Sequence, residues 1–218
     1  MNVHIKIKTI LILLLELSII GILGVILLWL SNNYIYQHPS RPIFRIVGSI
    51  ASIIVLAVFF LIKKPSLEYL GLNFKTIFQK NRKFYIIGLI INVLMIIISY
   101  FFDPRFFTMT IRFCIVAPVF EEIIFRGYVW KRLEEKQFKS ITIIIVTGIL
   151  FGLYHLAGYY EIRYSTSFFN DAPPLYKILM DKVFFNSIYG MALGFARYKS
   201  NNLYLTIIIH SILNLAGH

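Results

Sequence analysis

The sequence is short of charged residues, and of acidic ones above all. Charged residues make up 15% of its 218 residues, with 10 Asp and Glu against 22 Lys and Arg, whereas about 25% is usual for a soluble domain. The single cysteine, Cys114, excludes an intramolecular disulfide and is expected to pack as a small hydrophobe. The sequence also has no Gly-rich phosphate loop and no His-Glu-x-x-His motif. The low charge argues against a soluble protein.

Long apolar runs take the place of charge. Hydrophobic residues make up 58% of the chain, and most gather in runs long enough to span a bilayer, which takes roughly 17–25 residues. Because backbone groups in lipid need internal partners, such runs form helices. The sequence therefore predicts an all-α fold, a polytopic transmembrane helix bundle that forms one domain with about seven spans. The expected spans are residues 9–30, 43–62, 84–102, 106–129, 140–158, 182–197 and 201–216.

The basic residues lie mainly in the short segments between these runs. With the N-terminus inside, fourteen Lys and Arg fall in inner segments and seven in outer ones, so the positive-inside rule predicts a multi-pass protein of the cell membrane with its N-terminus inside. This pattern indicates contact with anionic lipid in the bilayer and not with nucleic acid. Residues 63–83 are either an amphipathic helix on the inner leaflet or a plain basic loop. The outer segment 159–181 is either a connector or a cap over a substrate entrance.

Ionisable residues nevertheless occur inside three of the expected spans. Charge at the centre of a membrane helix costs roughly 2.5–3.5 kcal/mol per Asp, Lys or Arg, so such groups on three spans are expected to act together. In the fourth span, Glu122 and Arg126 are four residues apart and can pair on one helical face. Glu121 points about 100° away from Glu122 and can face a different neighbour. Pro118, about one turn earlier, removes a backbone hydrogen bond and can kink the helix.

The fifth span carries His155, four residues after Phe151. Gly148 and Gly152 leave a small-residue face on which another helix can approach closely, and His155 lies on the same side. Glu121 and His155 are almost equally far from the polar turn that joins their spans, so an antiparallel hairpin would bring them to similar depth. A carboxylate beside an imidazole can activate water as a general base. The alternative is that His155 only forms a hydrogen bond between two helices.

The last span carries His210 and Asn214, one turn apart on one face. Both side chains can donate hydrogen bonds to a developing oxyanion. Alternatively, His155, His210 and Glu121 could bind zinc with an open fourth position. Two further glycines in the sixth span, Gly190 and Gly194, would allow that span to pack closely against this group.

The three patterns, in this order, resemble the CPBP family of intramembrane proteases, named for CAAX proteases and bacteriocin-processing enzymes and also called the Abi family. The matching residues are Glu121-Glu122-x-x-x-Arg126, Phe151-x-x-x-His155 and His210-x-x-x-Asn214, flanked by Pro118, Gly127, Gly190 and Gly194. The resemblance covers about residues 106–216, which we interpret as the CPBP/Abi protease core. Residues 1–105 would then hold the N-terminal spans and the amphipathic inner-leaflet segment.

The resemblance implies an endopeptidase that cuts a peptide bond within or beside the membrane. Glu121 and His155 would activate the attacking water. His210 and Asn214 would stabilise the tetrahedral oxyanion. The substrate would be a membrane-associated or leader-type peptide or membrane protein, and a true CAAX substrate would carry a prenyl group.

The same resemblance implies that Glu122, Arg126 and Phe151 support the site. Family members are commonly labelled metalloproteases, although a metal-free glutamate mechanism is also argued for the CAAX enzymes, and we favour metal-free chemistry over zinc. The alternative function is a non-catalytic bacteriocin self-immunity or membrane scaffold protein. The intact motifs favour the enzyme over the scaffold, and the absence of an internal repeat argues against a transporter.

Overall fold

The computed structural model describes residues 3–35, 41–73, 82–102, 104–158 and 174–216. Within these ranges the regular secondary structure is helical and there is no strand, which confirms the all-α fold class. The first three predicted spans appear as α1 (Val3–Ile35), α2 (Arg41–Lys63) and α4 (Arg82–Phe102).

The fourth predicted span is part of a longer helical path. Its consecutive segments are α5 (Pro104–Ile111), η1 (Arg112–Val116), α6 (Ala117–Glu122), η2 (Ile123–Val129) and α7 (Trp130–Glu135). The segments η1 and η2 are π-helical, and such wide turns are rare and often lie at functional sites. Pro118 does not end the path, because it lies in the first turn of α6 directly after η1.

The remaining helices are α8, the path from α10 to α11, and α12. They comprise α8 (Ser140–Tyr154), the 3-10 turn η3 (His155–Gly158), α10 (Leu175–Leu179), the π-helical η4 (Met180–Phe185), α11 (Asn186–Ser200) and α12 (Leu203–Ala216). The sixth predicted span began at residue 182, and the helix begins earlier because Lys177, Asp181 and Lys182 interrupt the apolar run without interrupting the helix. Of the outer segment 159–181, only residues 174–181 are described; the rest of this predicted connector or cap lies outside the described residues.

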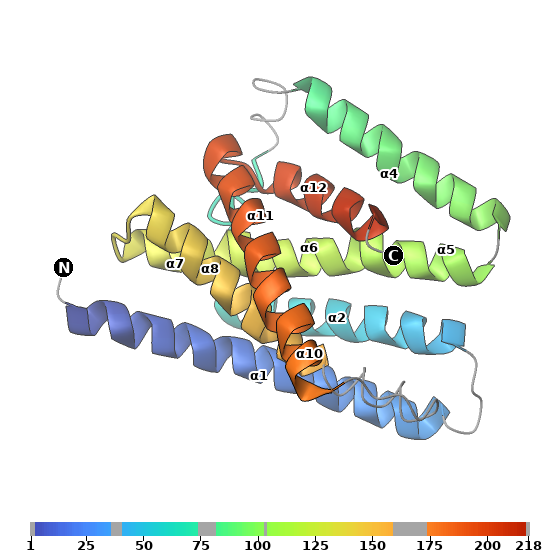
Figure 1. Ribbon diagram of the computed structural model, residues 1–218, viewed down its shortest axis with the longest axis horizontal. Helices are drawn as coiled ribbons and strands as arrows, with labels where there is room; N and C mark the ends of the chain where they lie inside the picture. The colour runs from blue at the N-terminus through green and yellow to red at the C-terminus, as the bar shows by residue number, and fades with distance from the viewer. Residues whose placement is uncertain (1–2, 36–40, 74–81, 103, 159–173, 217–218) are drawn as a thin grey trace.

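Figure 1 shows the α5–α7 path running through the middle of the molecule, with α12 and α4 on one side and α1 and α2 on the other. The helix α11 crosses this arrangement steeply and packs against α8. The loop after α2, residues 64–73, forms turns and no helix, and residues 74–81 of the predicted amphipathic segment lie outside the described residues. In that loop Leu67 is exposed and Leu70 is fully buried.

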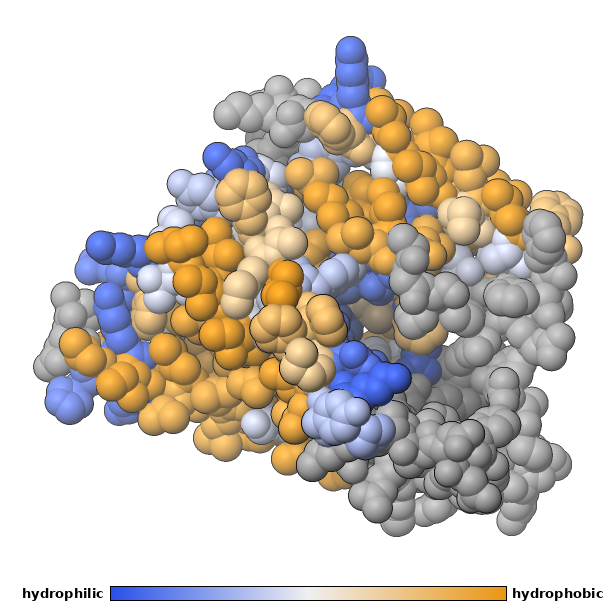
Figure 2. All heavy atoms as spheres, in the orientation of Figure 1, coloured by the Kyte–Doolittle hydropathy of each residue, from blue (hydrophilic) through white to orange (hydrophobic). Residues whose placement is uncertain are grey.

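Two of the described helices are long and apolar enough to cross a membrane, Val3–Leu27 in α1 and Arg82–Phe101 in α4. Three shorter apolar helices are Ser49–Lys63, Ser140–Tyr154 and Leu203–Leu215. The outward side chains of α1 and α4 are largely apolar and exposed, as Figure 2 shows for the visible face, and such surface suits contact with lipid. The total of about seven spans and the orientation of the N-terminus stay predictions.

The helices α1 and α2 are joined to the central path by polar contacts as well as by apolar packing. Glu16 of α1 pairs with Lys63 of α2 at 2.6 Å and accepts a hydrogen bond from the Tyr128 hydroxyl of η2 at 3.2 Å. The Tyr128 ring also packs edge-on against Phe59 of α2. The isolated acidic residue of the first span is therefore paired with a base and contacts the central path.

Glycines allow α8 and the α10–α11 path to approach closely. A side chain at Gly190 would place its first carbon 3.0 Å from the Gly148 Cα atom and 3.1 Å from Phe151. A side chain at Gly152 would collide with Ser187 and with the Val183 carbonyl. The small-residue face predicted on the fifth span is confirmed, and it packs against η4 and α11, which correspond to the sixth predicted span.

Gly152→Ala is expected to destabilise the protein by about 1–3 kcal/mol, because the added methyl group overpacks an interface that includes backbone atoms. Denaturant unfolding in detergent micelles measures the change. The matched control is Gly24→Ala in α1, where an added methyl group meets nothing within 4 Å and helix propensity favours alanine. Equal stability of the two variants would contradict the close approach of α8 and α11.

Candidate active site

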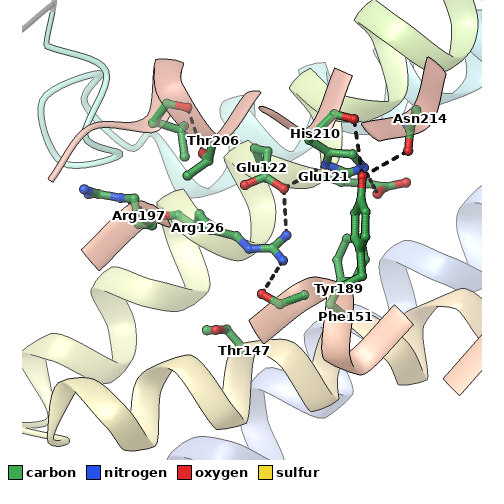
Figure 3. A network of polar contacts seen from close by, with 12 residues as sticks. Glu121, Glu122, Arg126, Thr147, Phe151, Tyr189, Arg197, Thr206, His210 and Asn214 are labelled. Carbon is green, nitrogen blue, oxygen red and sulfur yellow. Dashed lines mark hydrogen bonds and ion pairs between the residues drawn. The ribbon is translucent and has the colours of Figure 1, made fainter. Parts of the chain in front are cut away.

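A buried ion pair lies at the centre of the site. Arg126 Nη1 donates to Glu122 Oε1 at 2.7 Å, and both side chains are 0% exposed, so the predicted pairing of these residues is confirmed. Arg126 Nη2 donates to the carbonyl of Gly190 in α11 at 2.8 Å. Buried charges persist only when they are paired and hydrogen-bonded. The contacts join α6 and η2 to α11, as Figure 3 shows.

His210 of α12 lies between the two adjacent glutamates. Its Nδ1 is 2.9 Å from Glu122 Oε1, and its Nε2 is 3.6 Å from Glu121 Oε2. Because a carboxylate only accepts hydrogen bonds, we assign a proton to Nδ1, which donates it to Glu122. Nε2 then faces Glu121, whose side chain is 14% exposed. The two glutamates therefore contact different nitrogens of one imidazole ring.

Phe151 of α8 packs against the charged groups and their aromatic neighbours. Its ring lies 4.5 Å from the guanidinium carbon of Arg126 and 5.8 Å, centroid to centroid, from the ring of His210. It is 1% exposed. A guanidinium over an aromatic face is stabilised most where water is excluded. These contacts give a physical basis for the supporting role that the sequence pattern implies.

Pro118 provides the place where α12 docks on the central path. Because it has no N–H, it cannot bond to the carbonyl of Cys114 four residues earlier, or to that of Phe113 five residues earlier, which an α-turn or a π-turn would use. Both carbonyls accept hydrogen bonds from α12. The Ser211 hydroxyl donates to Cys114, and Asn214 Nδ2 donates to Phe113 at 2.8 Å. The missing donor thus sets the register of α12 against η1 and α6.

His155 lies beside this network without bonding to its carboxylates. It begins η3, and its Nδ1 is 2.8 Å from the Phe151 carbonyl. The residues that directly precede Glu121 and His155, Phe120 and Tyr154, have ring centroids 6.4 Å apart, so the two helices come to similar depth here as the equal spacing predicts. Within the described part of the chain, no hydrogen bond or ion pair joins His155 to Glu121. The histidine that lies close to Glu121 is His210.

Sequence reasoning missed Tyr189 of α11. Its hydroxyl is 3.3 Å from Asn214 Oδ1 and 3.3 Å from the His210 carbonyl oxygen. Its ring packs edge-on against the imidazole of His210 with centroids 5.4 Å apart. One signal was available, because Tyr189 directly precedes Gly190, the glycine predicted to bring the sixth span close. Tyr189 thus contacts both His210 and Asn214 of α12 from the side of α11, as Figure 3 shows.

The predicted zinc ligands do not form a group in this structure. Among the described residues, no three His, Cys, Asp or Glu side chains are arranged to hold a metal ion. His210 and Glu121 are close to each other, but His155 Nδ1 bonds to the carbonyl of its own helix. The residues in this arrangement therefore do not fit a three-ligand zinc site.

Comparison with known proteins identifies one related family. A family model described as Rce1-like, type II CAAX prenyl endopeptidase, matches residues 103–216. The matched range is more than half of the 218 residues and includes every residue of the candidate site. No curated protein and no solved structure matches the chain.

Proposed function

Because the chain belongs to the Rce1-like family of type II CAAX prenyl endopeptidases, we propose that it hydrolyses a peptide bond of a membrane-associated or leader-type peptide. The family is one of membrane-integral proteases. The attacking water is activated by Glu121 with His155, and the oxyanion is stabilised by His210 and Asn214. The observation that carries this proposal is the contact of both glutamates with the His210 ring.

Glu121 is suited to the role of base. It is the carboxylate of the pair that keeps some exposure, whereas Glu122 is fully buried and already paired with Arg126. In the proposed reaction Glu121 takes a proton from water as the water oxygen attacks the carbonyl carbon. The proton then passes to the leaving amine as the C–N bond breaks. Glu122 keeps its charge throughout and holds the imidazole of His210 in place, as a buried carboxylate does in other acid–base dyads.

The donors for the oxyanion follow from the remaining hydrogen-bonding capacity. With Nδ1 bonded to Glu122, His210 donates to an oxyanion from Nε2 when the imidazole is protonated. The Asn214 amide has two N–H groups, of which one donates to Phe113, and the second can serve the oxyanion. His155 has its Nδ1 bonded to the Phe151 carbonyl, so its Nε2 is the nitrogen that would assist Glu121.

The proposal is tested with purified protein in lipid vesicles and two probe peptides. One is a farnesylated peptide that ends in a CAAX sequence, and the other is an unlipidated leader-type peptide; cleavage is followed by mass spectrometry. We expect the wild-type protein to cut at least one of them, and Glu121→Ala and His155→Ala each to lose most of this activity. Glu134→Ala, which removes an exposed carboxylate from α7, is the matched control.

Cleavage by both site variants, at normal expression, would reject catalysis by these residues. Failure of the wild-type protein on every peptide would favour the non-catalytic scaffold. Parallel reactions with a chelator and a metal analysis of the purified protein address the cofactor. We propose metal-free chemistry, so chelation is expected to leave the rate unchanged, and a loss of activity restored by zinc would overturn that part of the proposal.

A further inference from the structure

A second buried arginine lies one helical segment away from the proposed catalytic groups. Arg197 of α11 is 1% exposed, and its Nε donates to the backbone carbonyl of Arg126 at 3.1 Å. Its Nη1 donates to Asn201 Oδ1 at 3.2 Å, and its guanidinium lies 5.9 Å from the ring of Trp130. Within the described residues it forms no ion pair with a carboxylate, and Glu134 and Glu122 act on its charge only from a longer distance. A buried charge without a directly paired counter-ion is costly, so the hydrogen bonds that hold Arg197 need a physical account.

The carbonyl that Arg197 binds is one that the π-helical turn leaves without its usual donor. In an α-helix the Arg126 carbonyl would accept a hydrogen bond from the N–H of Trp130. That N–H instead bonds to the oxygens of Phe125 and Gly127. Arg197 Nε takes the place of the missing donor. The guanidinium therefore stabilises the wide turn at the residue whose side chain pairs with Glu122.

Loss of this wide turn would move the catalytic groups relative to the core. A change of register by one residue rotates one part of a helix against the other by about 100°. Glu121 and Glu122 precede η2, whereas Trp130 and Leu133, both buried, follow it. With Trp130 and Leu133 fixed in the core, the π-helical turn η2 therefore determines the direction in which the two glutamate side chains point.

The loop after α2 covers Arg197 and connects it to α12. A side chain at Gly71, whose φ is +82°, would collide with the guanidinium of Arg197. The Gly71 carbonyl accepts a hydrogen bond from the N–H of Leu203, the first residue of α12, at 3.1 Å. Arg197 therefore lies where η2, α11 and the start of α12 meet. The same three elements supply Arg126, the Gly190 carbonyl and His210.

We propose that Arg197 is a positioning residue for the catalytic groups, acting by holding the Arg126 carbonyl and with it the π-helical turn η2. This inference rests on the proposed function for its kinetic consequence only. Without the Nε contact, η2 relaxes toward α-helical bonding, and the Glu122–Arg126 pair no longer holds His210 in its position beside Glu121. Substrate binding does not involve Arg197 directly, because its guanidinium is buried under the loop and bonded to backbone and Asn201.

The kinetic test is Arg197→Met, assayed with the peptide that the wild-type protein cleaves. Loss of a hydrogen bond from a charged donor at this position is expected to lower kcat by about tenfold or more, while KM changes by less than about threefold. Arg197→Lys, which keeps the charge and one possible donor, is expected to recover part of kcat. Lys199→Met removes an exposed cation from the same helix and is expected to leave both constants unchanged.

A second readout needs no substrate. In protein labelled with ¹⁵N-histidine, the His210 signal is identified by its loss in His210→Asn. The wild-type signal is expected to show a protonated, hydrogen-bonded Nδ1, because that nitrogen lies 2.9 Å from Glu122. Arg197→Met is expected to move this signal, and Lys199→Met is not. If no peptide is cleaved by the wild-type protein, the proposed function fails, and the His210 signal alone decides the positioning role.

If Arg197→Met does not fold, Gly71→Ala is a second variant that tests the same contact without replacing Arg197. Its methyl group would push the guanidinium off the Arg126 carbonyl, so the same shift of the His210 signal is expected, with the same fall in kcat. Gly24→Ala is its control. A folded Arg197→Met or Gly71→Ala protein with wild-type kcat and an unmoved His210 signal would overturn the inference.

Discussion

Glu121→Gln is expected to lower kcat by about 10²–10⁴-fold, the range that a positioned general base contributes. Glutamine keeps the size of the side chain and its hydrogen-bonding oxygen but cannot accept a proton from water. Because Glu121 is the partly exposed member of the pair and lies 3.6 Å from His210 Nε2, its replacement leaves the buried Glu122–Arg126 pair intact. The measurement is kcat and KM with the peptide that the wild-type protein cleaves, with KM expected to change little.

Glu134→Gln is the control for this prediction. Glu134 pairs with Lys131 on the exposed side of α7 and makes no hydrogen bond or ion pair with the described residues of the site, so its variant is expected to keep the wild-type rate. Unfolding curves of both variants should coincide with that of the wild-type protein. A Glu121→Gln protein that retains more than a tenth of the wild-type kcat would assign the base to another residue, and His155 and His210 would be the groups to replace next.

Arg126→Met is expected to destabilise the protein by about 3–5 kcal/mol, the cost of leaving one member of a buried ion pair uncompensated. Glu122 is 0% exposed and would lose the donor that lies 2.7 Å from its Oε1. The Gly190 carbonyl would lose its donor as well, and Phe151 its guanidinium neighbour. Denaturant unfolding in detergent micelles measures this loss.

The double variant Glu122→Leu, Arg126→Met separates the charge from the packing. Replacing both members of a buried pair by apolar residues is often neutral, so the double variant is expected to recover much of the stability that Arg126→Met loses. It should remain inactive, because His210 then has no carboxylate on Nδ1. An Arg126→Met protein as stable as the wild-type would contradict the buried ion pair, whatever the activity of the double variant.

The sequence predicted the parts of the site that depend on helical spacing. The pairing of Glu122 with Arg126 and the close approach at Gly148 and Gly152 follow from intervals of four residues, and both are confirmed. The helices could be predicted because their apolar runs are long enough to span a bilayer. The roles of Glu121, His155, His210 and Asn214 in catalysis stay predictions that the experiments above decide.

What spacing could not predict depends on departures from ideal helices and on contacts between distant segments. The π-helical turns shift the faces of the central path, and no sequence pattern marks them. In the sequence Tyr189 is one more residue of an apolar helix, and Arg197 is one of several basic residues at a helix end. Their hydrogen-bonding partners are far away along the chain. Pro118 was expected to kink the helix, and its larger effect is on the two carbonyls to which α12 bonds.

The contacts of Glu16 with Lys63 and Tyr128 bear on how much of the chain the protein needs for a stable fold. The family match begins at residue 103. Tyr128 lies in η2, the turn that carries Arg126, and contacts Glu16 of α1 and Phe59 of α2, which both precede that boundary. Truncation at the boundary would remove Glu16 and Phe59 from Tyr128 and leave Arg132, 5.9 Å from its ring, as a charged neighbour. The N-terminal helices therefore stabilise the half of the chain that the family model matches, and a chain shortened to residues 103–216 would lose these contacts.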